Sequence, residues 1–144
     1  MRYWDASALV PAIVNEAGSD LVDDWLKTDD AVCTWGLTRV ELASAIERRA
    51  REGALTAGQR RAALKLVADL STAATEVLDL EAVRERAVPL LGRYLLRAAD
   101  ASQLAAALVV VEGGIRGLPF VCLDRRLADA ASREGFDVLG WPDG

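Results

Sequence analysis

The sequence predicts an α/β fold in which helices cover both faces of a parallel β-sheet. Two observations carry this prediction. Short apolar runs of strand length alternate with longer helical segments, and acidic residues follow two strands directly, as Asp5 follows residues 2–4. With 144 residues, 52% of them hydrophobic, the chain suits one domain with a real core over residues 1–144. Ligands of such sheets bind beyond the carboxyl ends of the strands, so a site is expected there.

The first half of the chain is expected to form two strands and four helices. In chain order these are a strand at 2–4, helices at 8–15 and 20–27, a strand at 31–34, and helices at 36–51 and 57–70. Ser7, Ser19 and Thr56 can accept hydrogen bonds from the first turns of the helices that follow them. Gly53 suits the position just after a helix, where a left-handed backbone is common.

The second half continues the alternation. The expected elements are a weak strand at 75–78, a helix at 81–91, an irregular segment at 92–99, a helix at 100–112, a strand at 120–123, a helix at 127–134 and a strand at 136–139. The helix at 100–112 has the clearest pattern, because Ala101, Leu104, Ala105 and Leu108 follow the i, i+3, i+4, i+7 spacing. Pro89 is expected to distort the end of its helix.

Composition excludes several classes of site. The chain has no histidine, which removes Ser-His-Asp triads, Cys-His nucleophiles and histidine-ligated zinc. Cys33 and Cys122 lie in apolar runs and are expected to be buried thiols. No apolar run is long enough to span a membrane, and no signal-peptide pattern opens the sequence. The expected compartment is therefore the cytoplasm.

The formal net charge is −5, which argues mildly against nucleic-acid binding through the overall field of the protein. Arg48, Arg49 and Arg51 nevertheless cluster at the end of a predicted helix. They are either solvated helix residues or a local basic rim beside an acidic pocket. If they are only solvated, a nucleic acid would have to follow another path, such as Arg97 and Arg125.

Four acidic residues could converge on one pocket. Asp5 and Asp124 follow predicted strands, Asp100 opens an apolar helix, and Glu41 lies among apolar residues of another helix. Helix capping alone could explain each aspartate, but capping does not account for Glu41. Clustered like charges are costly unless a cation neutralises them, so the set points to a divalent metal site and to phosphate chemistry.

Read in order, four segments resemble the PIN-domain family, in particular VapC-like toxins of bacterial toxin–antitoxin pairs. The segments are Tyr3-Trp-Asp-Ala-Ser-Ala-Leu9, Thr38-Arg-Val-Glu-Leu-Ala43, Leu96-Arg-Ala-Ala-Asp-Ala-Ser-Gln-Leu-Ala105 and Phe120-Val-Cys-Leu-Asp-Arg-Arg-Leu-Ala128. They span almost the whole chain. The resemblance implies a three-layer fold with a five-stranded parallel sheet of order 3-2-1-4-5. It also implies a Mg²⁺- or Mn²⁺-dependent endoribonuclease that forms a homodimer and is inhibited by a cognate antitoxin.

The resemblance also implies roles for individual residues. Asp5, Glu41, Asp100 and Asp124 would form the acidic quartet that binds metal and carries catalysis, with Asp5 and Asp100 as the first ligands. Ser7 and Thr34 would be supporting hydroxyl residues, and Gln103, one turn after Asp100, could orient a ligand or water. Arg48, Arg49, Arg51 and Arg97 would contact RNA or antitoxin. The chain departs from many members at Gln103 and Cys122, where those members have histidine and threonine.

Three other functions compete with this interpretation. An aspartyl phosphatase usually has a second aspartate two residues after the first, where this chain has Ser7. A receiver domain needs a lysine after a late strand, whereas Lys27 and Lys65 lie in predicted helices. A PIN-like module that only binds a partner is the third alternative, and the departure at Gln103 keeps it open.

Overall fold

The computed structural model describes residues 1–143, and in this part of the chain five parallel strands form one sheet in the order β3-β2-β1-β4-β5. The strands are β1 (Arg2–Trp4), β2 (Val32–Trp35), β3 (Thr75–Val77), β4 (Phe120–Val121) and β5 (Val138–Leu139). The central strand is β1, in which Tyr3 pairs with Cys33 of β2 and Phe120 of β4. The predicted α/β class and strand order are therefore confirmed.

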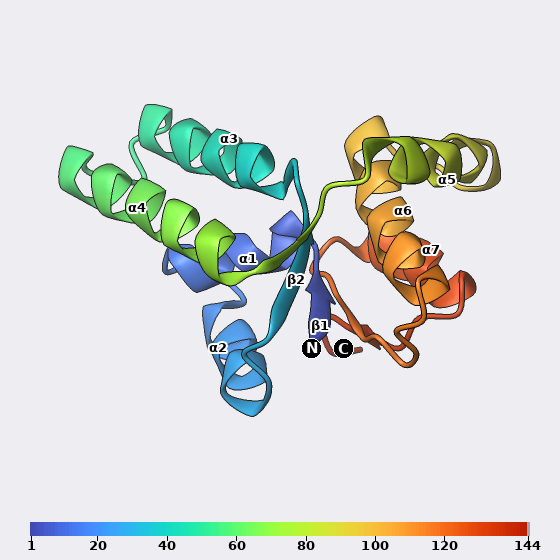
Figure 1. Cartoon of the computed structure of the whole chain (residues 1–144). Helices are drawn as coiled ribbons and strands as arrows, with labels where there is room; N and C mark the ends of the chain where they lie inside the picture. The colour runs from blue at the N-terminus through green and yellow to red at the C-terminus, as the bar shows by residue number, and fades with distance from the viewer. Residues whose placement is uncertain (144) are drawn as a thin grey trace.

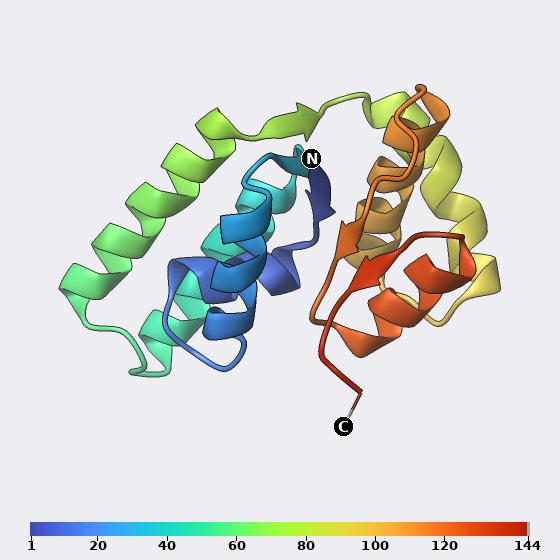
Figure 2. The same cartoon turned by 90° about the horizontal axis from the view of Figure 1, so that it is seen from below.

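Helices cover both faces of this sheet. They are α1 (Ala6–Ile13), α2 (Ser19–Thr28), α3 (Thr38–Arg51), α4 (Ala57–Ala73), α5 (Leu80–Arg93), α6 (Ala98–Glu112) and α7 (Arg125–Arg133). In Figure 1, α1–α4 lie to the left of the sheet and α5–α7 to the right. Figure 2 shows the chain crossing from one group to the other through β3. Among the described residues, no helix has both the length and the apolar character that a membrane span requires.

Alternating strand side chains build a separate core on each face. Tyr3 and Phe120 stack at 5.3 Å between ring centroids on the side of α5–α7. Trp4 and Val121, their neighbours in sequence, pack into the core on the side of α1–α4. Because successive strand residues face opposite sides, each short strand contributes to both cores. This anchors the strand ends, from which Asp5 and Asp124 emerge.

The helix starts differ from the predicted ones at several places. The first helix begins at Ala6, with Asp5 and not Ser7 as its cap, and the third begins at Thr38 and not at residue 36. Gly18, with a φ of 95°, precedes α2 where Ser19 was expected to cap it. The Ser19 hydroxyl instead donates to the Pro11 carbonyl at 2.7 Å. A serine or an aspartate can cap a helix, so local sequence does not decide between neighbours.

Other boundaries move by a few residues. The fourth helix continues past Leu70 to Ala73, and α5 includes Pro89 and continues to Arg93. The predicted irregular segment 92–99 is therefore reduced to residues 94–97, since α6 begins at Ala98. Strands β4 and β5 are shorter than predicted, although the flanking residues Asp137 and Cys122 still hydrogen-bond across the pair. The caps at Thr56 and the helix end at Gly53 are as predicted.

Candidate active site

Asp5 leaves the carboxyl end of β1 and caps α1. Its Oδ2 accepts hydrogen bonds from the backbone N–H of Ser7 at 3.1 Å and from the Ser7 hydroxyl at 2.5 Å. The residue is only 4% exposed. The capping role is therefore real, and it leaves the other carboxylate oxygen, Oδ1, for a ligand.

Ser7 also joins Asp5 to the end of β4. Its hydroxyl oxygen accepts from the backbone N–H groups of Leu123 at 3.0 Å and Asp124 at 3.2 Å while its proton goes to Asp5. The Asp124 side chain caps α7, with Oδ1 accepting from the N–H groups of Arg126 and Leu127. One hydroxyl thus holds together the ends of two adjacent strands, and with them two of the four acidic residues.

Glu41 is held by a polar network that crosses between the two halves of the chain. Gln103 of α6 donates through Nε2 to Glu41 Oε1 and to Thr38 Oγ1, both at 3.0 Å. The Tyr3 hydroxyl donates to Gln103 Oε1 at 2.6 Å. Gln103 is fully buried, so its amide has a fixed set of partners and fixes Glu41 in turn.

Asp100 lies in the first turn of α6 and not at its cap as predicted. Its Oδ2 accepts from the backbone N–H of Arg97 at 3.3 Å. This is a long hydrogen bond, and the carboxylate is half-buried. The capping contribution is therefore small, and Asp100 stays available to the pocket.

The four carboxylates influence one another electrostatically. Burial raises the pKa of Asp5 to about 6, and the charges of Asp100 and Asp124 add to the increase. Burial raises the pKa of Glu41 to about 7, with a further increase from Asp5. Burial and the Asp124 charge also raise the pKa of Asp100. These charge effects link residues from four distant segments, two of which, Asp5 and Asp124, follow the strands β1 and β4 in the chain.

The donor set fits a hard divalent cation. Its groups are carboxylates, the ligands that Mg²⁺ and Mn²⁺ prefer, and a cation would favour the charged forms of Asp5 and Glu41 that burial disfavours. Within residues 1–143, no three such side chains are already gathered closely enough to coordinate one ion. Mg²⁺ usually keeps several waters and takes one or two carboxylates directly, so a complete protein cage is not required.

A groove of about 590 Å³ opens beside these carboxylates. Glu41, Asp100 and Ser7 line it together with Arg48, Arg49 and Arg97. Of these arginines, Arg49 is already bound to Glu16, with its Nε at 2.6 Å from a carboxylate oxygen. No ion pair links Arg48 or Arg97 to a carboxylate in the described part of the chain. Of the predicted basic rim, Arg48 and Arg49 line the groove and Arg51 does not, while Arg97, from the alternative path, lines it as well.

Two predicted or competing features fall outside the site. Cys33 and Trp35 face the core on the side of α5–α7, so Thr34 between them faces the opposite layer. Among residues 1–143, the hydrogen bonds that the four carboxylates accept come from other residues and not from the Thr34 side chain. Lys27 pairs with Asp24, and Lys65 pairs with Asp69. Neither lysine is available at the strand ends, which disfavours a receiver domain.

Sequence reasoning missed Thr38 and Tyr3. Thr38 precedes Glu41 by one helical turn, so a shared face could have been inferred from spacing. Tyr3 reaches Gln103 across 100 positions of sequence, and no local pattern indicates that contact.

Comparisons with known proteins agree with this geometry. The family model described as PIN domain matches residues 2–132. Two relatives from Mycobacterium tuberculosis, ribonuclease VapC45 of strain CDC 1551 and ribonuclease VapC49 of strain H37Rv, are each 36% identical to this chain over 137 residues. These matches cover 94% of this chain and 92% of each relative.

Solved structures show the same fold. A toxin–antitoxin complex from Klebsiella pneumoniae aligns with a TM-score of 0.61 at 16% identity, over 96% of both chains. FitAcB from Neisseria gonorrhoeae aligns with a TM-score of 0.66 at 14% identity, also over 96% of both chains. At these identities the likeness concerns the fold alone.

Proposed function

The chain belongs to the PIN-domain family, and from this premise we propose that it is a metal-dependent endoribonuclease, the toxin of a toxin–antitoxin pair. Two relatives named as ribonucleases VapC, 36% identical over nearly the whole chain, support the activity. The single observation that carries the proposal is the coupling of buried carboxylates: burial and the charges of Asp100 and Asp124 raise the pKa of Asp5 to about 6, and burial and the charges of Asp5 and Asp100 raise that of Glu41 to about 7.

Asp5 and Asp100 would be the direct ligands of Mg²⁺ or Mn²⁺, and Glu41 and Asp124 would complete the set or hold water. A bound divalent cation would supply positive charge against the scissile phosphate and lower the pKa of a water nearby. Ser7 holds Asp5 in place, and Gln103 holds Glu41, so both carboxylates meet the substrate in fixed positions. No histidine is needed for this chemistry.

Arg48 and Arg97 would bind the phosphates of the RNA on the groove side. Their guanidinium groups line the groove with Glu41 and Asp100, and neither is paired with a carboxylate among residues 1–143. A guanidinium fork binds phosphate through two parallel hydrogen bonds. The same unpaired arginines would bind an acidic segment of an antitoxin when RNA cleavage is inhibited.

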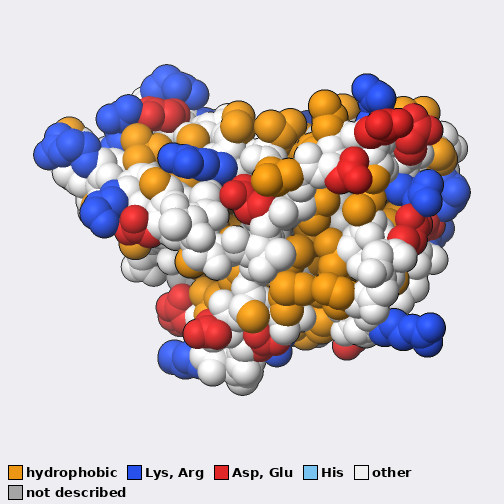
Figure 3. Space-filling view, viewed as in Figure 1, with side chains coloured by type: hydrophobic (Ala, Val, Ile, Leu, Met, Phe, Trp, Pro, Cys, Tyr) orange, Lys and Arg blue, Asp and Glu red, His pale blue; other side chains and the backbone are white. Residues whose placement is uncertain are grey.

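The chain would also form a homodimer. Leu78 and Leu80, at the start of α5, are 72% and 60% exposed, and Leu95, just after the end of α5, is 80% exposed. Figure 3 shows hydrophobic atoms in the upper middle of this face, between the two helical groups, and basic side chains over α3 and α4. A second copy of the chain would cover these leucines.

A PIN-like module that binds a partner without cleaving RNA is the second candidate. The observation that favours it is Gln103, because an amide at this buried position holds Glu41 but cannot exchange a proton. Loss of RNA cleavage in Asp5→Asn, with folding retained, would separate the two candidates in favour of the enzyme.

The direct experiment is incubation of purified, antitoxin-free protein with total RNA, in Mg²⁺ or in EDTA, followed by mapping of the cut sites. Discrete cuts that require Mg²⁺ and vanish in Asp5→Asn support the nuclease. RNA that stays intact with Mg²⁺ and with Mn²⁺ would leave the binding module as the better function.

A further inference from the structure

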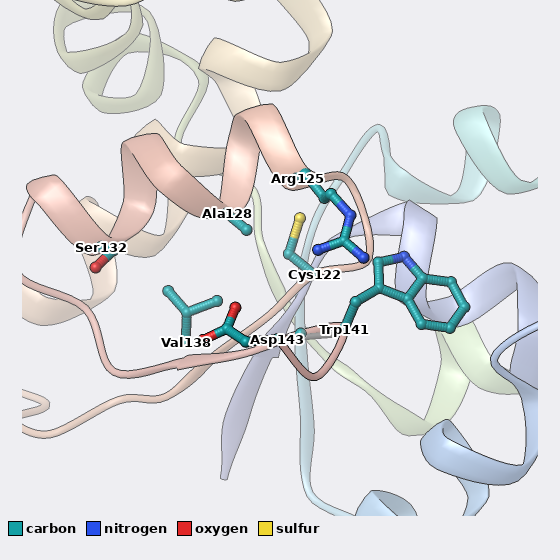
Figure 4. A pocket seen from close by; sticks show the side chains of 8 residues that line it. Cys122, Arg125, Ala128, Ser132, Val138, Trp141 and Asp143 are labelled. Carbon is teal, nitrogen blue, oxygen red and sulfur yellow. The ribbon is translucent and has the colours of Figure 1, made fainter.

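A second cavity, of about 350 Å³, lies between α7 and the segment that includes β5 and the residues after it. Helix α7 contributes Arg125, Ala128 and Ser132 to its lining, and the C-terminal segment contributes Val138, Trp141 and Asp143 (Figure 4). Its volume is within the usual range of small-molecule sites and is large enough for one nucleotide base with part of its sugar. None of the roles discussed so far uses this cavity.

Cys122 connects the cavity to the carboxylates. It lines the cavity, its Sγ lies 3.6 Å from Asp5 Oδ2, and it donates to the Asp124 carbonyl at 3.3 Å. The groove with Arg48 and Arg97 borders Glu41 and Asp100, the other two acidic residues, whereas the second cavity adjoins Asp5 and Asp124 through Cys122.

Trp141 places a rigidly held indole at the border of the cavity. Its indole Nε1 donates to the Leu123 carbonyl at 2.8 Å, which fixes the orientation of the ring. Gly18, with a φ of 95°, lets the ring pack closely, since a Cβ there would lie 3.0 Å from Trp141 Cη2. Aromatic walls of this kind bind nucleic-acid bases by stacking.

Arg125 and Asp143 supply opposite hydrogen-bonding character in the same cavity. Figure 4 shows the guanidinium near Cys122 and Trp141 and the carboxylate near Val138. Neither forms an ion pair with another side chain among residues 1–143. One cavity thus offers a fork of N–H donors and a pair of acceptor oxygens that the fold itself does not consume.

We propose that this cavity binds a guanine base next to the scissile phosphate, an inference that rests on the proposed ribonuclease function. Guanine presents two adjacent N–H donors, at N1 and N2, which a carboxylate such as Asp143 accepts together. It also presents acceptors at O6 and N7, which suit the Arg125 guanidinium. Adenine lacks the N1 proton, and neither pyrimidine presents both patterns. The cavity would make the enzyme select cut sites beside guanine.

The test uses the Asp5→Asn protein with Mg²⁺, so that RNA remains intact. Its binding to labelled single-stranded uridine octamers, each with one central guanine, adenine, cytosine or uracil, is measured by fluorescence anisotropy. We expect guanine to be preferred by about tenfold or more, the discrimination typical of a bidentate contact. Adding Asp143→Asn should remove the preference of guanine over adenine, and Arg125→Gln should weaken guanine binding most.

Matched controls are Asp137→Asn and Arg133→Gln, which change exposed residues of the same region outside the cavity. Trp141→Leu removes core packing as well as the aromatic ring. Its RNA binding is therefore compared with that of Trp141→Phe, which keeps an aromatic ring. Equal affinity for all four bases, no RNA binding, or a guanine preference that survives Asp143→Asn would overturn the proposal. Cutting by the wild-type protein that ignores guanine would overturn it and leave the nuclease intact, whereas guanine binding without any cutting would overturn the nuclease alone.

Discussion

At the residue scale, the acidic side chains combine structural and chemical roles in one group. Asp5 is both the cap of α1 and a carboxylate whose burial raises its pKa to about 6. A cap needs an oxygen and no charge, since asparagine caps helices about as well as aspartate. The charge of Asp5 therefore serves something other than the fold, and substitution can separate the two roles.

Replacing Asp5 by asparagine should abolish RNA cleavage and leave the metal-free protein as stable or more stable. One oxygen of Asp5, Oδ2, takes both bonds from Ser7, so an amide oxygen can replace it. A pKa raised from 3.8 to about 6 corresponds to up to about 3 kcal/mol of relief at neutral pH. Thermal melting in EDTA measures the change, beside cleavage assays in Mg²⁺.

Two other variants define what the asparagine result means. Asp5→Ala should be about 1 kcal/mol less stable than Asp5→Asn, because alanine cannot cap. Asp79→Asn, which changes the cap of α5, should alter neither stability nor cleavage. A large loss of stability in metal-free Asp5→Asn would mean that the charge itself holds the fold.

Without metal, the protein should become more stable as the pH falls from about 8 to about 5. The folded-state pKa values of Asp5 and Glu41, about 6 and about 7, exceed their ordinary values of 3.8 and 4.5. In this window the folded protein binds protons that the unfolded chain does not. This stabilisation of the folded state is complete at pH values below the ordinary pKa values of the two groups. It is lost as the pH rises through their folded-state pKa values, about 6 and about 7.

Denaturant unfolding at several pH values in EDTA measures this dependence. Asp29 acts in the opposite sense, since the N-terminal ammonium lowers its pKa, but its contribution falls away only in more acidic solution. Adding Mg²⁺ should flatten the slope between pH 5 and 8, as a cation favours the charged carboxylates. A metal-free stability that rises with pH in this window would contradict the proposed clustering.

At the element scale, helix α6 is hydrogen-bonded to α3 of the other helical layer through Gln103. Gln103 reaches Thr38 and Glu41 of α3 and accepts from Tyr3 of β1, while Asp100 one turn earlier lies in the groove. The position of α6 relative to α3 therefore sets the separation of two of the four acidic residues. This makes the network a positioning device for the site.

Gln103→Leu should lower cleavage by about 10- to 100-fold, the usual cost of losing a partner of a metal ligand. The leucine keeps the volume but releases Glu41, so the apparent affinity for Mg²⁺ should fall as well, while the fold persists. Activity against Mg²⁺ concentration measures both effects. Ser102→Ala, on the exposed side of the same turn, is the matched control. Equal Mg²⁺ dependence in both variants would contradict the positioning role.

The arginines at the end of α3 should differ in effect. Arg48→Gln should weaken RNA binding, because the side chain lines the groove without a carboxylate partner. It should also lower the slope of log affinity against log salt concentration by about one. Arg51→Gln should change neither, as Arg51 lies outside the groove lining. RNA binding is measured at several salt concentrations with proteins that carry each arginine substitution together with Asp5→Asn, so that the RNA stays intact. Equal effects from both variants would mean that the cluster acts only through its general field.

At the scale of the whole molecule, the exposed leucines at the start of α5, Leu78 and Leu80, predict self-association. Leu80→Asp should weaken the homodimer by at least about tenfold, since a charge in an apolar interface is left without a partner. Sedimentation across a concentration series measures the shift. Leu66→Asp, on α4, is the control, with 48% exposure in wild type. A dimer that survives Leu80→Asp and fails in Leu66→Asp would place the interface on the other helical layer.

The sequence by itself determined the α/β class, the order of the elements and the four acidic positions. The hydrophobic periods of strands and helices can be recognised within a few residues, so the alternation of strands with helices can be predicted without a structure. Asp5 and Asp124 could be placed at one edge because parallel strands end together. Through the family resemblance, Glu41 and Asp100 joined them. Boundaries were less certain, as at Asp5 and Ser7, because neighbouring residues can cap equally well.

Only the tertiary structure decided which side chains hold the acidic residues and which remain free. Gln103 binds Glu41 across 62 positions, and Arg49 is taken by Glu16 across 33, so one predicted RNA contact is already paired. Thr34 has no hydrogen bond to the acidic residues in the described part of the chain, whereas Thr38 accepts from Gln103, which holds Glu41. These outcomes depend on how helices pack across the sheet. Packing is a property of the whole chain, and no local spacing encodes it.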